Sequence, residues 1–181
     1  MNEKERAQKI KMIIMDVDGT LTNGSLLVLP DGEELKSYNV KDGTGILLAH
    51  LAGLRTGIIT GKISKPLEKR AEKLKITEVY QGIFDKKKIL VKILEKNNLK
   101  SEEVAYIGDD LGDLEVIKRV GLSGAVANAH PTIKKHCHYI CESPGGGGAV
   151  REFIEFILDS QNKWDTIEAG FKDLVNQKEQ L

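Results

Sequence analysis

The sequence predicts an α/β protein with a Rossmann-like three-layer fold, in which helices cover both faces of a parallel central sheet. Three observations support this prediction. Short apolar runs alternate with helical patterns, 181 residues suit one core, and acidic or hydroxyl residues directly follow several of the runs. In such folds ligands bind beyond the carboxyl ends of the strands, so we expect the functional site where those polar residues gather.

The expected elements follow from hydrophobic periodicity. Buried strands are predicted at short apolar runs, namely residues 11–15, 56–60, 79–80, 104–107, 124–126 and 139–141. Helical spacing fills the intervals, at residues 43–52, 66–74, 85–97, 111–120, 131–135 and 149–159, with a short helical turn at 101–103. This alternation favours parallel strands, because a parallel pair needs a long crossover connection.

One segment interrupts the alternation. Residues 25–29 and 34–40 flank the turn sequence Pro-Asp-Gly-Glu at 30–33, which predicts a β-hairpin over about 24–40 that projects from the end of the first strand. Residues 160–181 are polar, with Trp164, Ile167 and Phe171 at helical spacing, and predict a loosely held helical tail. We expect a single domain over 1–159, followed by this C-terminal tail over 160–181.

Charge balance excludes several classes of partner. The 27 basic residues cancel the 27 acidic ones, so no broad field attracts nucleic acid or anionic membrane, and we expect neither as a partner. The apolar stretch 45–54 is shorter than the roughly 20 residues of a membrane helix, and no signal peptide is recognisable.

Cys137 and Cys141 are expected on one strand about 13 Å apart, beyond disulfide reach. Free thiols indicate the cytoplasm.

The strongest chemical feature is the run Asp16-Val17-Asp18-Gly19-Thr20, directly after the first apolar strand. Two aspartates separated by one residue at a strand end can present both carboxyls to one site, and Gly19 lets the chain turn away. One carboxylate can then act as a nucleophile or metal ligand and the other as a general acid and base. The plain alternative is an acidic turn without function.

Two later positions carry groups that suit a phosphate. Thr60, Gly61 and Lys62 end the second strand with a hydroxyl, a flexible backbone and an amine. Lys86 begins the helix after the third strand, where its ammonium can neutralise both a phosphate and a carboxylate nucleophile. Taken alone, the lysines at 86–88 would be a solvated charge run.

The end of the fourth predicted strand carries an acidic cluster. Gly108-Asp109-Asp110 follows the strand at 104–107, and Asp113 comes three residues later. Carboxylate oxygens are the ligands that hard divalent cations prefer, so this cluster could complete a cation site together with Asp16.

These residues together resemble the haloacid dehalogenase superfamily of phosphotransferases. The resemblance rests on D-x-D-G-T at 16–20, Thr60, Lys86 and G-D-D-x-x-D at 108–113, and it covers residues 11–158. It implies that Asp16 attacks phosphorus to form an aspartyl-phosphate, while Asp18 protonates the leaving alcohol and then activates water. Thr60 and Lys86 complete the implied catalytic set. The implied cofactor is Mg²⁺, held by Asp16, the Asp18 backbone carbonyl and Asp109, with Asp110 and Asp113 supporting.

The spacing of these motifs leaves no room for a cap domain. The 41 residues between Asp18 and Thr60 are used by the hairpin and one helix, and the 25 between Thr60 and Lys86 by one helix and one strand. A site without a cap is exposed to water unless another subunit covers it. The projecting hairpin is the candidate for this cover, and we therefore expect a homo-oligomer, a tetramer, with the active sites at the subunit boundaries.

A closer resemblance is to the 3-deoxy-D-manno-octulosonate 8-phosphate phosphatase family, capless tetramers of lipopolysaccharide precursor synthesis. It rests on K-S-Y-N-V-K-D-G at 36–43 and on segments 80–82, 104–110 and 145–152. The resemblance implies a hydrolase that acts on the phosphomonoester of a small sugar acid. The implied substrate contacts are Asp18, Asn39, Val40, Lys41, Asp42, Gly43, Thr60, Gly61, Lys62, Arg70 and Lys86.

Some residues depart from that family, which commonly has arginines where this chain has Lys41, Leu47, Lys62 and Gly147. Lysine cannot make the bidentate grip of arginine on an anion. Phosphates of related 9-carbon sugar acids, of the sialic acid or KDN type, therefore stay open as substrates. A regulatory or phospho-acceptor function also stays open. Phospho-receiver domains, however, place an adjacent acidic pair at the first strand, whereas Asp16 and Asp18 are separated by one residue.

Four further features have competing interpretations. Residues 136–141 combine histidine and cysteine as zinc sites do, but on a strand the two cysteines would face away from His136 and His138. His130 is expected to cap a helix rather than reach the site. Glycines 145–148 suit either a phosphate cradle or a flexible turn, and the Trp164 tail suits packing or a neighbouring site.

Overall fold

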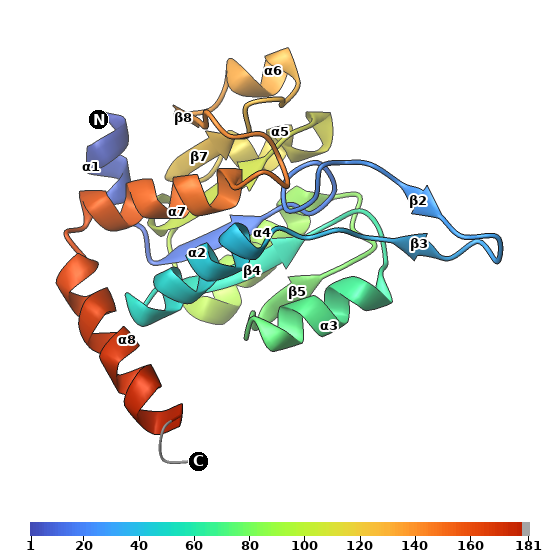
Figure 1. Ribbon diagram of the computed structural model, residues 1–181. Coiled ribbons are helices and arrows are strands. Elements are labelled where there is room, and N and C mark those ends of the chain that lie inside the picture. Colours follow the sequence, from blue (N-terminus) through green and yellow to red (C-terminus); the bar gives the residue numbers. More distant parts are fainter. Residues whose placement is uncertain (179–181) are drawn as a thin grey trace.

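Six parallel strands form the central sheet, in the order β5-β4-β1-β6-β7-β8 (Figure 1). The structure, a computed structural model, describes residues 1–178; the last three residues of the predicted tail lie outside the described part. The strands are β1 (Met12–Met15), β4 (Arg55–Ile59), β5 (Glu78–Tyr80), β6 (Val104–Gly108), β7 (Leu122–Ala125) and β8 (Tyr139–Ile140). The predicted parallel sheet is confirmed, and each predicted strand lies within two residues of the observed one.

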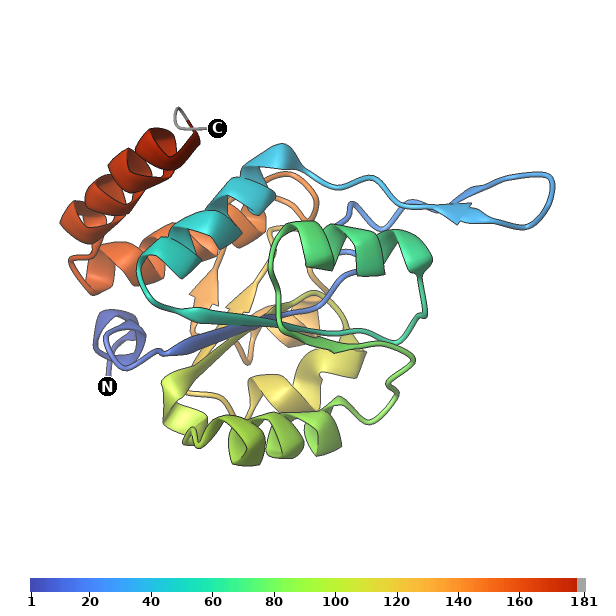
Figure 2. The same ribbon diagram turned by 90° about the horizontal axis from the view of Figure 1, so that it is seen from below.

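Helices cover both faces of this sheet, which confirms the three-layer fold. Figure 2 shows α2 (Val40–Leu51), α3 (Lys65–Lys73) and α7 (Ala149–Ser160) on one face, and α4 (Lys86–Asn97) and α5 (Leu114–Ile117) on the other. The remaining helices are α1 (Glu3–Ala7), α6 (Pro131–Lys134) and α8 (Trp164–Lys178), with 3₁₀ turns at Ser101–Glu103 and Leu111–Asp113.

The register of β1 brings three strand ends together. Met15 is paired with Ile58 of β4 on one side and with Ile107 of β6 on the other. The whole of β1 is buried, because its apolar side chains pack under helices on both faces. The residues that follow β1, β4 and β6 consequently emerge side by side at one edge of the sheet.

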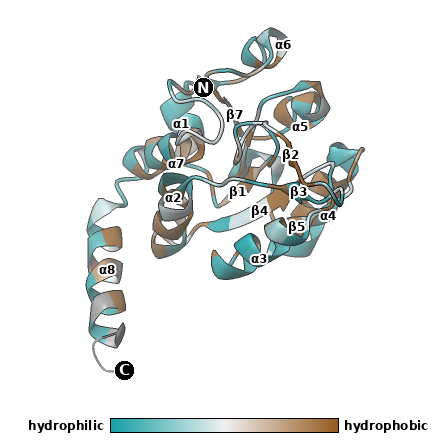
Figure 3. Cartoon of the chain, turned by 45° about the vertical axis from the view of Figure 1, so that its right-hand side comes forward, coloured by the Kyte–Doolittle hydropathy of each residue, from teal (hydrophilic) through white to brown (hydrophobic). Residues whose placement is uncertain are grey.

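The β-hairpin is present but shorter than predicted. β2 (Leu27–Val28) and β3 (Glu34–Leu35) pair antiparallel, with Gly32 in the turn at φ +85°. The predicted arms 25–29 and 34–40 are wrong in extent, because the hairpin projects away from the sheet and has no third strand to pair with (Figure 1). In Figure 3 the apolar β2 is brown although it lies far from the core.

Two helix predictions also need correction. α2 begins at Val40 rather than residue 43, because the Asn39 side chain accepts a hydrogen bond from the backbone N–H of Lys41 at 2.8 Å and caps the helix. The helix predicted at 111–120 is a 3₁₀ turn followed by the short α5. There, the side chain of Asp110 accepts from the N–H of Leu111, and Asp113 faces back toward β6.

The C-terminal α8 packs beside α2 through a small area. Ile167 is buried, and a Cβ on Gly170 would lie 2.9 Å from Leu51, so the two helices approach closely there. Trp164 and Phe171 stay partly exposed. The first half of the tail is thus docked more firmly than its polar composition predicts. No helix within residues 1–178 is long and apolar enough to cross a membrane.

Candidate active site

The carboxyl ends of three neighbouring strands form an open cleft of about 300 Å³. Asp16 and Asp18 follow β1, Thr60 follows β4, Asp109 follows β6, and Lys86 is the first residue of α4. The structure thus brings together most of the predicted site, since the cleft is lined by Asp16, Asp18, Thr60, Gly61, Lys62, Ile83, Phe84, Lys86, Asp109, Asp110, Gly112 and Asp113.

The loop after β1 is pressed against the loop after β6. Gly19 has φ +91°, and a Cβ there would lie 2.1 Å from a carboxylate oxygen of Asp109, so only glycine fits. The hydroxyl of Thr20 donates to Asp109 at 3.1 Å. The glycine and threonine of the D-x-D-G-T motif therefore hold Asp109 beside Asp16.

Lys86 joins the two sides of the cleft. Its ammonium donates to Oδ1 of Asp16 at 2.5 Å and to Oδ1 of Asp113 at 2.7 Å, and it lies 3.2 Å from the hydroxyl of Tyr106. Asp113 also accepts from that hydroxyl at 2.5 Å and from the backbone N–H of Asp109 at 3.0 Å. Asp113 is thus fixed by groups from α4 and β6.

Tyr106 is a member of this network that sequence reasoning missed. Its ring is fully buried in β6, where a tyrosine hydroxyl needs a hydrogen-bond partner. The sequence did carry a signal for this contact. The strand at 104–107 was expected to be buried next to an acidic cluster, so a tyrosine in it needs a partner such as a carboxylate for its hydroxyl.

The site carries more negative than positive charge. Burial, and then the charge of Asp113, raise the pKa of Asp16 to about 8, although Lys86 opposes the shift. Burial and Asp113 likewise raise the pKa of Asp109 to about 6. Burial alone would lower the pKa of Lys86, but Asp16 and Asp113 outweigh it and raise that pKa. Three carboxylates around one ammonium leave a deficit of positive charge.

A divalent cation fits this deficit. Asp16, Asp109 and Asp113 each offer a carboxylate oxygen, and these oxygens lie within 4.8 Å of one another. Such hard oxygen donors match Mg²⁺, which is commonly bound through one or two carboxylates with water completing its shell. Asp110 is exposed and its side chain caps the following turn, so its predicted supporting role is less direct than that of Asp113.

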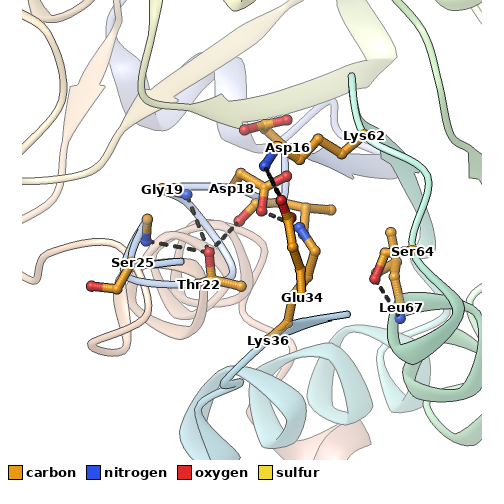
Figure 4. Close-up of polar contacts among 12 residues, drawn as sticks. Asp16, Asp18, Gly19, Thr22, Ser25, Glu34, Lys36, Lys62, Ser64 and Leu67 are labelled. Atoms are coloured by element: carbon orange, nitrogen blue, oxygen red, sulfur yellow. Dashed lines mark hydrogen bonds and ion pairs between the residues drawn. The ribbon is translucent and has the colours of Figure 1, made fainter. Parts of the chain in front are cut away.

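The hairpin contributes two charged residues that the sequence motifs did not single out for the site. Figure 4 shows Lys36 reaching Asp18 and Glu34 reaching Lys62. The Lys62–Glu34 ion pair is 3.1 Å long and exposed, whereas the Lys36 side chain is only 5% exposed. Lys36 begins the motif at 36–43, but spacing could not reveal either contact, because both depend on where the base of the hairpin's returning arm passes the cleft.

Several predicted substrate contacts lie behind the cleft rather than in it. The carboxylate of Asp42 is buried and accepts from the backbone N–H of Arg151 at 3.0 Å, at the start of α7. Gly148, the N-cap residue of α7, has no side chain of its own to do this. Asp42 therefore caps α7 from a different helix.

The neighbouring predicted contacts also face other parts of the fold. A Cβ on Gly43 would lie 2.4 Å from the guanidinium of Arg70, which in turn lies over the ring of Tyr38 at 5.9 Å. The Asn39 side chain bonds the carbonyl of Gly146 at 3.0 Å, while Val40 and Lys41 are exposed. Their roles in substrate binding stay predictions.

The glycines at 145–148 support the loop that follows β1 instead of opening onto the cleft. A Cβ on Gly145 would lie 1.7 Å from the carbonyl oxygen of Gly19, and the N–H of Gly146 donates to the carbonyl of Thr20 at 2.9 Å. Only glycine permits this approach. The segment therefore packs directly on the turn that follows Asp18.

The histidines and cysteines near β8 form no metal site within residues 1–178, where the one cluster of possible ligands is the aspartate group above. β8 contains only Tyr139 and Ile140, so the two cysteines and His136 and His138 all lie outside it, and the predicted strand-face argument was wrong. Both cysteines are free thiols, as expected. His130 caps α6 through a hydrogen bond from the N–H of Thr132 at 3.1 Å, also as expected.

Known proteins are similar to this chain in both sequence and architecture. The family of haloacid dehalogenase-like hydrolases matches residues 56–154. The 3-deoxy-D-manno-octulosonate 8-phosphate phosphatase of Yersinia pestis is 45% identical over 159 residues, which cover 88% of this chain and 85% of that protein. The crystal structure of the Yersinia pestis phosphatase superposes with a TM-score of 0.88 at 44% identity, covering 90% of this chain and 88% of that one.

A second solved structure is similar over a larger share. The phosphatase of the same name from Moraxella catarrhalis, in complex with magnesium ion, phosphate ion and KDO, has a TM-score of 0.89 at 38% identity and covers 93% of this chain and 97% of that one. From these matches, the chain belongs to the haloacid dehalogenase-like hydrolases and, within them, to the 3-deoxy-D-manno-octulosonate 8-phosphate phosphatase family.

Proposed function

We propose that this protein is a Mg²⁺-dependent phosphatase that releases phosphate from 3-deoxy-D-manno-octulosonate 8-phosphate, a step in lipopolysaccharide precursor synthesis. The observation that carries the proposal is the convergence of Asp16, Asp18, Lys86 and Asp109 on one cleft in a chain of this family. Carboxylates, an ammonium and a cation site around one point suit phosphoryl transfer, which depends on positioning and charge stabilisation.

Asp16, Asp109 and Asp113 would hold the Mg²⁺ ion, together with the Asp18 backbone carbonyl. When bound, the ion would neutralise charge on the phosphoryl oxygens and supply the positive charge that the cleft lacks. Lys86 bonds both Asp16 and Asp113, which fixes the positions of these two buried carboxylates.

The proposed reaction proceeds in two displacements. Asp16 forms a bond to phosphorus while the bond from phosphorus to the sugar oxygen breaks, and Asp18 gives its proton to that oxygen, so the free sugar acid leaves. Water then attacks the phosphorus of the aspartyl-phosphate, the bond from phosphorus to the Asp16 oxygen breaks, and the attacking water gives a proton to Asp18. Inorganic phosphate departs and both carboxyl groups return to their starting forms.

Thr60, Gly61 and Lys62 are proposed to bind the phosphoryl oxygens not held by the ion. Thr60 is buried at the end of β4, with Gly61 and Lys62 exposed at the edge of the cleft. Lys62 forms an ion pair with Glu34 in this structure, so on substrate binding the phosphoryl group would replace the Glu34 carboxylate as the partner of Lys62. Asn39, Val40, Lys41, Asp42, Gly43 and Arg70 stay proposed as contacts or supports of the sugar part.

A 9-carbon sugar acid phosphate is the second candidate substrate. Lys41 and Lys62 offer a single point charge, and Leu47 and Gly147 none, at positions where arginine is common in the family. Weaker binding of the substrate's carboxylate at these positions would allow a longer sugar acid to bind. The same catalytic residues would serve both substrates.

We further propose a homo-tetramer that works in the cytoplasm. The hairpin exposes Leu26, Leu27, Val28 and Leu35, which form an apolar surface far from the core. Exposed apolar patches of this kind are typical of protein interfaces.

The free cysteines agree with a reducing compartment. We also propose that residues 1–159 are one domain and 160–181 an appended tail.

A substrate panel tests the proposed function. Phosphate release is measured from the 8-carbon and 9-carbon sugar acid phosphates and from unrelated sugar phosphates, with Mg²⁺ and with EDTA. We expect the highest kcat/KM on the 8-carbon ester and no turnover with EDTA. Preference for the 9-carbon ester would change the substrate, and equal rates on all esters would contradict a sugar-acid specificity.

A further inference from the structure

Lys36 has no part in the mechanism above, yet its side chain contacts Asp18, which lines the cleft. The ammonium of Lys36 bonds Oδ1 of Asp18, and the side chain is only 5% exposed (Figure 4). Lysine is rarely buried, because removing an ammonium from water is costly unless a partner compensates it. Asp18 is the one acidic partner of Lys36 within residues 1–178.

The contact belongs to a built arrangement rather than a single surface pair. Glu34 lies in β3, and Lys36 and Tyr38 lie in the segment without regular secondary structure that joins β3 to α2. Glu34 pairs with Lys62, and the ring of Tyr38 lies under Arg70. Burial and then the charge of Asp18 raise the pKa of Tyr38 to about 12. The returning arm of the hairpin is therefore seated along the cleft.

The geometry fixes one oxygen of Asp18 and leaves the other available. The contact with Lys36 uses Oδ1, while Oδ2 accepts no hydrogen bond within residues 1–178. A carboxyl group held through one oxygen by a buried ammonium has a restricted side-chain torsion. Its second oxygen then points in a defined direction, and proton transfer depends strongly on such alignment.

We propose that Lys36 is a positioning residue that orients Asp18 for proton transfer to the leaving alcohol, an inference that rests on the proposed function. In that step the proton on Asp18 moves to the leaving oxygen as its bond to phosphorus breaks and the bond from Asp16 forms. Lys36 keeps its own protons throughout. It acts only through the direction in which Asp18 points.

Leaving-group dependence separates this role from a general structural one. Phenyl phosphate and 4-nitrophenyl phosphate have similar shapes, but 4-nitrophenolate leaves with little need of protonation. Single-turnover rates are measured with enzyme in excess and Mg²⁺ present. For Lys36→Met we expect the rate on phenyl phosphate to fall about tenfold or more and the rate on 4-nitrophenyl phosphate to fall less than about threefold.

Two variants serve as controls. Lys36→Arg retains a cation and is expected to keep most of the phenyl phosphate rate, and Lys65→Met removes an exposed lysine at the start of α3, outside the cleft, and should behave as the wild type. Circular dichroism checks that Lys36→Met is folded. If it is not, the same two rates are measured with Lys36→Gln, which removes the charge but keeps a polar group.

The outcomes distinguish the two proposals. An equal loss on both esters, or no loss on either, overturns the positioning role of Lys36. A wild-type protein that turns over neither these esters nor the sugar acid phosphates contradicts the proposed function instead. A selective loss on phenyl phosphate supports both.

Discussion

The ammonium nitrogen of Lys86 lies 2.5 Å from Oδ1 of Asp16, and both side chains are only 8% exposed. The same nitrogen holds Asp113, so one buried cation faces two carboxylates. A buried ion pair is favourable only when its geometry is good and its remaining charges are compensated. The cleft is therefore an electrostatically incomplete site, whose missing positive charge a metal ion would supply.

Replacing Lys86 should abolish most of the activity. Without its ammonium, Asp16 and Asp113 repel each other and the phosphoryl group loses a cation, so we expect kcat/KM of Lys86→Met to fall by about 10² to 10³. Steady-state assay of phosphate release measures this. Lys87→Met is the matched control, because Lys87 is exposed on the next position of α4. Retention of more than a tenth of the wild-type activity would be inconsistent with the role of Lys86.

Mg²⁺ should stabilise the folded protein in the absence of substrate. Binding to the native state alone raises the free energy of unfolding by about 2.7 kcal/mol at a ligand concentration of 100 Kd. Thermal unfolding should therefore shift upward with Mg²⁺ for the wild type and for Asp31→Asn, an exposed turn variant. Asp109→Asn should lose the shift. An unchanged shift in Asp109→Asn would show that the ion binds elsewhere.

Asp42 should contribute to stability through α7. Because its carboxylate supplies the cap that Gly148 lacks, Asp42→Ala is expected to lower the free energy of unfolding by about 1–2 kcal/mol, measured by urea denaturation. Asp42→Asn keeps an acceptor oxygen and should lose less. Asp173→Ala, at an exposed position of α8, provides the control. Identical losses for Asp42→Ala and Asp173→Ala would rule out the capping role.

Glu78 should stabilise the fold above acidic pH. Burial alone would raise its pKa, but hydrogen bonds from Lys96 at 2.9 Å, Asn97 at 3.2 Å and Tyr80 at 2.9 Å outweigh burial and lower the pKa below the usual 4.5. The unfolded chain therefore takes up the proton first as pH falls. The stabilisation is complete above the usual pKa and disappears as pH drops through the lower value in the folded state.

The substitution Glu78→Gln tests this sign. Its destabilisation, measured by urea unfolding, should be about 1–3 kcal/mol near pH 7 and should shrink near pH 3. Glu72→Gln is the control, because the side chain of Glu72 is 75% exposed. A destabilisation that grows as the pH falls would reverse the predicted direction.

Periodicity and strand-end chemistry were enough to predict the sheet and where the candidate cleft lies. Asp16, Asp18, Thr60 and Lys86 meet because parallel strands end at one edge, and that rule needs no tertiary contact. The length of the hairpin could not be predicted, because strands without a buried face have no pattern that fixes where pairing stops.

Contacts between distant segments were likewise out of reach. Asp42 caps a helix that begins more than a hundred residues later, and Lys36 reaches Asp18 only because the base of the hairpin's returning arm passes beside the cleft. Both residues lie in a segment whose motif resembles a substrate-binding one. The structure shows that Asp42 and Gly43 are used in packing α2 against α7 and Arg70, which spacing alone does not reveal.

The covalent intermediate on Asp16 is the central claim of the mechanism, and rapid acid quench of a single turnover tests it most directly. Protein in excess is mixed with 3-deoxy-D-manno-octulosonate 8-phosphate labelled in the phosphoryl group, quenched, and analysed by peptide mass spectrometry. We expect a transient phosphoryl group on Asp16 in the wild type and none in Asp16→Asn. Release of phosphate without any labelled protein, or label that persists in Asp16→Asn, would contradict the mechanism.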